Sequence, residues 1–70
     1  MTNQENIRFD PSKIRGIMAE RGDTQKRLAE ITSLSEQTIV KKLDGRIDFK
    51  AKEIVKIANH YKVSPVIFFV

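Results

Sequence analysis

The feature that most constrains the fold of this 70-residue chain is a series of helix start and stop signals. Asp10-Pro11 and Ser64-Pro65 each place a capping side chain before a proline, and proline fits the first turn of a helix. Gly22 and Gly45 each follow a stretch of helical apolar spacing and can close a helix in the left-handed conformation. The chain is therefore divided into short helical segments with tight links.

Between these signals, apolar residues recur at spacings of three and four, as they do on one face of a helix. The spacing predicts five short helices, over about residues 11–21, 25–31, 36–44, 51–61 and 65–69. Ile47 and Phe49 are expected to plug the core from the link before the fourth helix, and Ile67 and Phe68 from the last one. We expect a polar N-terminal arm over residues 1–9 and one compact all-α domain over residues 10–70.

The composition excludes several other classes of protein for this chain. The chain has no cysteine, which excludes disulfides and thiolate metal sites, and His60 alone cannot form a metal centre. The longest apolar run, Val66 to Val70, is too short to span a membrane, and no secretory leader opens the chain, so we expect a cytoplasmic protein. With no acid–base pair, nucleophile or phosphate-binding loop, we expect neither an enzyme nor a cofactor.

The net charge of +4, from 13 Lys and Arg against 9 Asp and Glu, is compatible with a polyanionic partner. The stretch from Gln25 to Arg46 adds a pattern: a two-turn helix, a short turn, and a second helix that opens with small polar residues. Four residues of that second helix should point away from its buried side: Glu36, Gln37, Val40 and Lys41. Gln can pair with adenine, Lys with guanine, and Val can touch a thymine methyl group.

This arrangement resembles the Cro/CI-type (lambda-repressor-like) helix-turn-helix family, a compact five-helix DNA-binding domain of many phage repressors and bacterial regulators. The resemblance extends over about residues 11–69. Within the family, the sequence is most similar to small regulators of temperate phages of Gram-positive bacteria. Its matching residues are Thr24-Gln25, Leu28-Ala29, Leu34-Ser35, Thr38-Ile39, Gly45, Ile57-Ala58 and Val63-Ser64-Pro65.

The resemblance implies a double-stranded DNA operator as partner and a role for each matching position. Gln37 and Lys41 would face base edges, with Glu36 and Val40 beside them. The remaining contacts would go to the sugar–phosphate backbone, from Gln25, Ser35, Thr38, Lys42 and Arg46. Phosphate contacts position such a domain, and base contacts specify its site.

The sequence departs from the family at three places. Ser33 stands in the turn where the family usually has glycine, so a positive φ there would be strained. Met18 and Leu43 replace an Arg–Glu ion pair that often joins the first and third helices of the family. Glu36 puts a carboxylate where DNA phosphates crowd, and Val40 makes the reading surface partly apolar.

These departures keep two functional hypotheses open. The first is a sequence-specific DNA-binding regulator of Cro type, acting as a dimer in a phage genetic switch. The alternative is an antirepressor, which docks onto a phage repressor protein and hides the DNA-reading helix of that repressor. Glu36 beside Val40 suits the alternative, because a carboxylate can pair with a partner's Lys or Arg and an apolar spot can be buried between proteins.

The last residues suggest a site of self-association. Five consecutive apolar side chains cannot all face one core from a single helical turn. Val66, Phe69 and Val70 are then left as an apolar patch and a candidate interface of a weak homodimer. The alternative is a crowded core with a frayed end.

Overall fold

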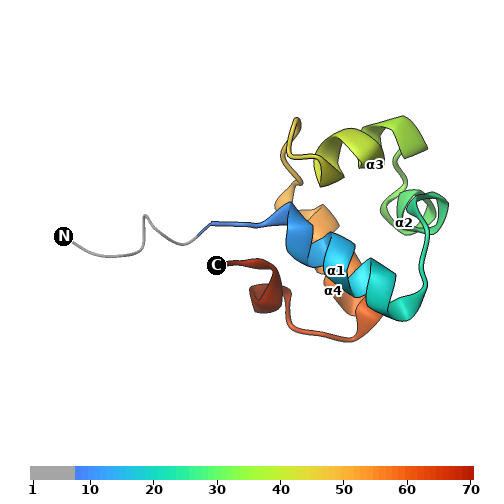
Figure 1. Ribbon diagram of the computed structural model, residues 1–70. Coiled ribbons are helices and arrows are strands. Elements are labelled where there is room, and N and C mark those ends of the chain that lie inside the picture. Colours follow the sequence, from blue (N-terminus) through green and yellow to red (C-terminus); the bar gives the residue numbers. More distant parts are fainter. Residues whose placement is uncertain (1–7) are drawn as a thin grey trace.

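The structure, a computed structural model, describes residues 8–70, which fold into a compact all-helical domain (Figure 1). Four α-helices are followed by one turn of 3₁₀ helix: α1 (Pro11–Arg21), α2 (Gln25–Thr32), α3 (Glu36–Leu43), α4 (Ala51–Tyr61) and η2 (Pro65–Phe68). The all-α class is confirmed. The prediction of five helices is not, because the described residues form four α-helices and the last segment is a 3₁₀ turn.

The capping signals explain where the helices begin and end. The side chain of Asp10 accepts a hydrogen bond from the backbone N–H of Ser12, and Thr24 and Ser35 cap α2 and α3 in the same way. Gly22 closes α1 in the left-handed region at φ 66°. Helix α4 has the bounds that the apolar spacing predicts, and α3 ends one residue earlier than expected.

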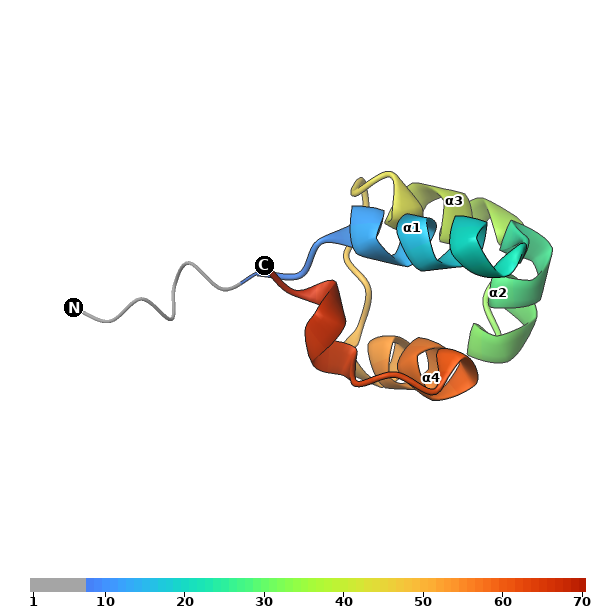
Figure 2. The same ribbon diagram turned by 60° about the horizontal axis from the view of Figure 1, so that its bottom comes forward.

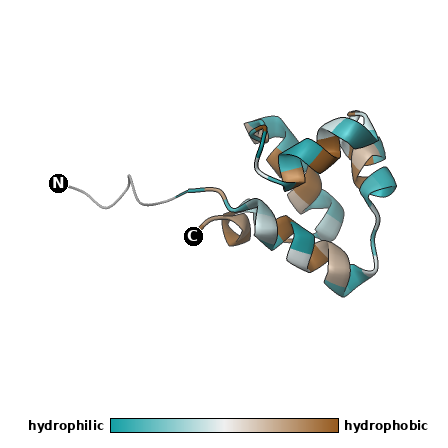
Figure 3. Ribbon diagram, turned by 45° about the horizontal axis from the view of Figure 1, so that its top comes forward, coloured by the Kyte–Doolittle hydropathy of each residue, from teal (hydrophilic) through white to brown (hydrophobic). Residues whose placement is uncertain are grey.

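Helix α2 packs against both α3 and α4, α1 packs against α3, and η2 contacts α1 and α4 (Figure 2). The core between them takes one apolar stripe from each helix, and brown apolar segments lie on the inner sides of the helices in Figure 3. Met18 and Leu43 both belong to this core. Phe49 is buried as predicted, but Ile47 is 42% exposed, so the prediction for Ile47 is wrong.

The two ends of the described chain are tied together. The backbone N–H of Val70 donates to the carbonyl of Arg8 at 2.9 Å, and that of Asp10 donates to Phe68 at 2.8 Å. Phe9 and Phe69 form an antiparallel bridge between them, so the two segments run side by side in Figures 1 and 2. The helix after Pro65 therefore stops at Phe68, because Phe69 must be extended to make this pairing.

This pairing corrects two predictions about the ends. Arg8 and Phe9 belong to the folded domain and not to a free arm; the rest of the predicted arm, residues 1–7, lies outside the described residues. At the other end Phe68 is fully buried as expected, whereas Ile67 is 44% exposed. Phe69 is half-buried and packs against the core, with its ring centroid 5.6 Å from that of Phe9.

Ser33 adopts the strained backbone that its position predicts, with φ 62° at the end of α2. A non-glycine residue there costs about 1–3 kcal/mol, part of which is offset because glycine loses more freedom on folding. We expect Ser33→Gly to raise the free energy of unfolding by about 1 kcal/mol in urea titrations. Ser33→Ala, which keeps the strain, should give no gain; a gain equal to that of Ser33→Gly would contradict this explanation.

None of the helices within residues 8–70 combines the length and the apolar character that crossing a bilayer requires.

Candidate nucleic-acid interface

Helices α2 and α3 are joined by a turn of three residues, 33–35, and they pack against each other. The left-handed Ser33 reverses the chain after α2, and Ser35 starts α3 by accepting a hydrogen bond from Thr38 N–H at 3.1 Å. Leu28 and Ile39 are fully buried between the two helices and the rest of the domain. The outer face of α3 is thereby fixed relative to α2.

The outer face of α3 carries the side chains that the sequence predicts to contact DNA bases. Glu36, Gln37 and Lys41 are exposed, and Val40 is half-buried. A shallow hollow is formed where Gln37, Val40 and Lys41 meet Arg46 from the following loop. The structure therefore places one amide, one apolar and two cationic side chains around a single depression.

The residues of the turn and of α2 that were predicted to contact the DNA backbone lie at helix starts. Gln25 is the first residue of α2 and is exposed. The hydroxyl of Ser35 donates to the hydroxyl oxygen of Thr38 at 2.9 Å, and Thr38 keeps its own O–H as a donor. Thr38 is half-buried, so this donor is held at the surface by the cap of α3.

Lys42 is not available for the predicted phosphate contact. Its side chain is buried, and Nζ lies 2.5 Å from Oε1 of Glu53 on α4. It also lies 5.7 Å from the centre of the Phe49 ring. The prediction for Lys42 is wrong, because the residue faces the core and ties α3 to α4.

Glu53 is the buried partner that the sequence analysis missed. Its Oε1 also accepts a hydrogen bond from the backbone N–H of Lys50 at 2.9 Å, at the start of α4. Burial alone would raise the pKa of Glu53, but the hydrogen bonds from Lys42 and Lys50 outweigh it, so the pKa lies below the ordinary value. The carboxylate is therefore charged at neutral pH and neutralises Lys42 inside the fold.

Arg46 is held by an ion network that includes a residue of α1. Asp44 pairs through Oδ2 with Arg46 at 2.9 Å and through Oδ1 with Arg15. The two Arg side chains are 59% and 52% exposed, so each retains N–H donors that face solvent. Arg15 was not predicted to lie at this site. It lies one helical turn before Met18 on α1, and Asp44 directly follows α3. The Arg15–Asp44 ion pair is therefore added at the surface, beside the core that contains Met18 and Leu43.

A second polar cluster fixes the start of α2 against the end of α4. Asp23 Oδ2 lies 2.9 Å from the Tyr61 hydroxyl and 3.0 Å from His60 Nε2. Partial burial raises the pKa of Asp23, but the hydrogen bonds from His60 and Tyr61 prevail and the pKa is lowered. Burial and the nearby Asp23 raise the pKa of Tyr61. His60, which the sequence left as an isolated residue, therefore has a structural partner.

The described residues contain no group of three His, Cys, Asp or Glu side chains that could hold a metal ion. Their side chains at the α3 face offer hydrogen-bond donors, positive charge and one small apolar spot. Such a set suits an extended polyanion or a protein surface.

Comparison with curated proteins and with solved structures finds no match in either. The profile of a family described as a protein of unknown function, DUF739, matches residues 7–66. This range includes the four α-helices that the structure describes and all the residues around the α3 hollow. The chain therefore belongs to the DUF739 family.

Proposed function

We propose that this protein is a sequence-specific DNA-binding transcriptional regulator of Cro/CI type that inserts α3 into the major groove. The observation that carries the proposal is the outer face of α3, where Gln37 and Lys41 are exposed around the hollow that Arg46 completes. A helix enters the major groove when its outer face presents polar side chains to the base edges, and phosphate-binding groups flank it.

The roles of the side chains follow from their chemistry. In this proposal Gln37 pairs with an adenine, Lys41 with a guanine, and Val40 contacts a thymine methyl group. Arg46 contributes a phosphate contact. Arg15 contributes a second one, because Asp44 holds both guanidinium groups close together. Gln25, Ser35 and Thr38 supply neutral hydrogen-bond donors to the sugar–phosphate backbone of the DNA.

The motif supports a role in a phage genetic switch in the bacterial cytoplasm. The order of Thr24-Gln25, Leu34-Ser35, Thr38-Ile39 and Val63-Ser64-Pro65 is similar to that of small regulators of temperate phages. Thr24, Ser35 and Ser64 cap helices, and Leu34, Ile39 and Val63 pack in or against the core. Most of the resemblance therefore lies in the scaffold that presents α3.

A second candidate, an antirepressor that binds a phage repressor protein, is favoured by one feature of the same face. Val40 is half-buried in the hollow, and the exposed Glu36 lies one turn before it. Lys42 is withdrawn from the surface, so α3 presents less positive charge than its sequence suggests. An apolar hollow beside a carboxylate suits a protein surface that carries Lys or Arg.

Fluorescence anisotropy tests the first proposal. Labelled duplexes that tile the DNA flanking the gene are titrated with the protein at two salt concentrations. We expect saturable binding to one duplex, well above binding to scrambled DNA, that weakens steeply with salt. Weak binding that is equal for all duplexes would contradict the DNA proposal and favour the antirepressor.

A further inference from the structure

Helices α3 and α4 are connected in space by a pair of buried side chains. Within residues 8–70, α3 packs directly against α1 and α2 but not against α4. The ion pair joins the two helices: Lys42 lies in the last turn of α3, and Glu53 lies in the first turn of α4. The link between the helices, residues 44–50, has no regular structure and includes a left-handed Gly45 at φ 82°. The link by itself therefore does not determine how α3 is oriented relative to α4.

The carboxylate of Glu53 is held in place by the backbone of α4. Its Oε1 accepts a hydrogen bond from the backbone N–H of Lys50, at the start of α4, at 2.9 Å. The same oxygen accepts a hydrogen bond from Lys42 Nζ at 2.5 Å, and the side chains of Lys42 and Glu53 are only 5% and 6% exposed. Glu53 is thus an anchor fixed to α4, and Lys42 attaches the last turn of α3 to that anchor.

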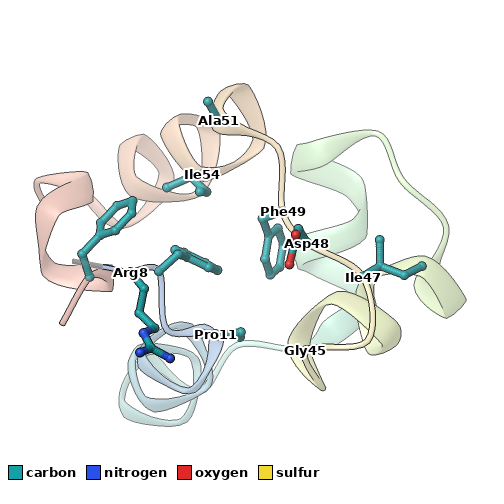
Figure 4. A pocket seen from close by; sticks show the side chains of 10 residues that line it. Arg8, Pro11, Gly45, Ile47, Asp48, Phe49, Ala51 and Ile54 are labelled. Atoms are coloured by element: carbon teal, nitrogen blue, oxygen red, sulfur yellow. The ribbon is translucent and has the colours of Figure 1, made fainter. Parts of the chain in front are cut away.

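The apolar contacts beside the ion pair do not supply the same constraint. The ring centre of Phe49 lies 5.7 Å from Lys42 Nζ, and the ring packs edge-on against Phe9, with centroids 5.5 Å apart. Phe49 also lines a surface hollow of about 620 Å³, together with Ile54 (Figure 4). The hollow leaves space into which an apolar contact can shift, because such contacts have no preferred direction. A hydrogen-bonded ion pair, by contrast, forms only when its two groups are correctly placed.

We propose that the Lys42–Glu53 ion pair sets the orientation of α3 for base recognition, so that both are positioning residues although neither reaches the DNA. This inference rests on the proposed DNA-binding function. Lys41, which is assigned to a guanine, is adjacent to Lys42 on α3, and Gln37 lies on the same helix. Recognition of base edges requires hydrogen-bonding groups that are held within about 0.5 Å of their correct positions. A small change in the orientation of α3 is therefore enough to weaken both base contacts.

The proposed phosphate contacts depend less on the orientation of α3. Gln25 and Arg15 belong to α2 and α1, and the side chain of Arg46 is 59% exposed and can adjust its position. Phosphate contacts supply non-specific binding, whereas specific binding also requires the base contacts. Loss of the ion pair should therefore lower the affinity for the operator and leave the affinity for scrambled DNA almost unchanged. A smaller fraction of folded protein would instead lower both affinities equally.

The double variant Lys42→Met/Glu53→Gln tests the proposal, because it removes the ion pair and keeps the net charge of the chain. In fluorescence anisotropy we expect its affinity for the operator to fall about tenfold or more, and its affinity for scrambled DNA to stay within about twofold of the wild type. Ile57→Val, which removes one buried methyl group of α4 outside the pair, is the control and should change neither affinity. Lys42→Leu/Glu53→Gln repeats the test with a second uncharged pair, and circular dichroism shows which variants are fully folded.

Residual dipolar couplings of the backbone N–H groups, measured without DNA, report the orientation of α3 directly. In the double variant we expect the couplings of α1, α2 and α4 to match the wild type and those of α3 to change. Couplings of α3 that match the wild type would overturn the positioning role, as would an unchanged operator affinity or an equal fall for operator and scrambled DNA. Changed α3 couplings, in a protein whose wild type binds no duplex specifically, would support the positioning of α3 and contradict only the DNA-binding function.

Discussion

Replacing Lys42 with Met should lower the free energy of unfolding by about 3–5 kcal/mol, whereas Lys41→Met should change it by less than about 0.5 kcal/mol. The two lysines are neighbours on α3, but Lys41 is exposed and Lys42 is 4% exposed. Without Lys42, the Glu53 carboxylate is left charged in a buried position with only the Lys50 N–H as a donor. A domain of this size has little stability to spare, so Lys42→Met should be partly unfolded at 37 °C.

Urea titrations followed by circular dichroism measure the difference, and a double variant separates the ion pair from its surroundings. Glu53→Gln alone leaves Lys42 without a counter-charge, although its amide oxygen can still accept from Lys50 N–H. Combining Lys42→Met with Glu53→Gln removes both charges and should recover most of the lost stability. If the two single effects simply add in the double variant, the buried pair is not the cause of the loss.

Acid should remove the contribution of the Lys42–Glu53 ion pair to the free energy of unfolding of the wild type. The pKa of Glu53 is lowered in the folded state, so below the ordinary value of 4.5 the unfolded chain binds a proton that the folded chain does not. The stability from the pair is complete above that pH and is lost as the pH falls through the lower folded pKa. Asp10 and Asp23 also have lowered pKa values, but both residues are present in the wild type and in the double variant, so their effects cancel in the comparison. The stability gap between wild type and the double variant should therefore change with pH only through the Lys42–Glu53 pair.

The four α-helices could be predicted from the sequence because their limits are set locally. Asp10, Thr24 and Ser35 satisfy free N–H groups within three residues of themselves, and Gly22 supplies a left-handed backbone without strain. The last segment could not be predicted in this way. Its end is set by pairing with Arg8, a contact between residues 62 positions apart (8 and 70) that no local pattern indicates.

The exposed residues of the candidate site were predicted correctly from helical spacing. The error at Lys42 arose because its role was taken from the family resemblance and not from that spacing. Ile39, Lys42 and Leu43 have the i, i+3, i+4 spacing of one helix face, so the pattern itself indicates that Lys42 is buried. Glu53 lies one turn before Ile57 on the buried face of α4 and could have been suspected as its partner. The pairing of Arg15 with Asp44 depends on how α1 packs against α3, which the sequence pattern does not determine.

On an operator found by anisotropy, Lys41→Ala should weaken binding by about 1–3 kcal/mol, about 5- to 150-fold, and Gln37→Ala should relax the preference at one base pair. Both side chains are exposed and neither bonds a described residue, so the loss would not come from unfolding. Lys56→Ala removes an equal charge from α4, away from the α3 hollow, and should weaken binding only slightly; an equal loss there would mean that net charge, not the α3 face, determines affinity.

Glu36 then distinguishes the two candidate functions, because they assign opposite effects to its carboxylate. In a DNA reader it repels phosphates, so Glu36→Gln should leave operator affinity unchanged or raise it. In an antirepressor it pairs with a basic side chain of the repressor, so Glu36→Lys should abolish that complex while circular dichroism shows an intact fold. Wild-type affinity for the repressor after Glu36→Lys would exclude Glu36 from such an interface. A Glu36→Gln variant that loses operator binding would mean that the carboxylate accepts a hydrogen bond from a base, as a cytosine amino group allows.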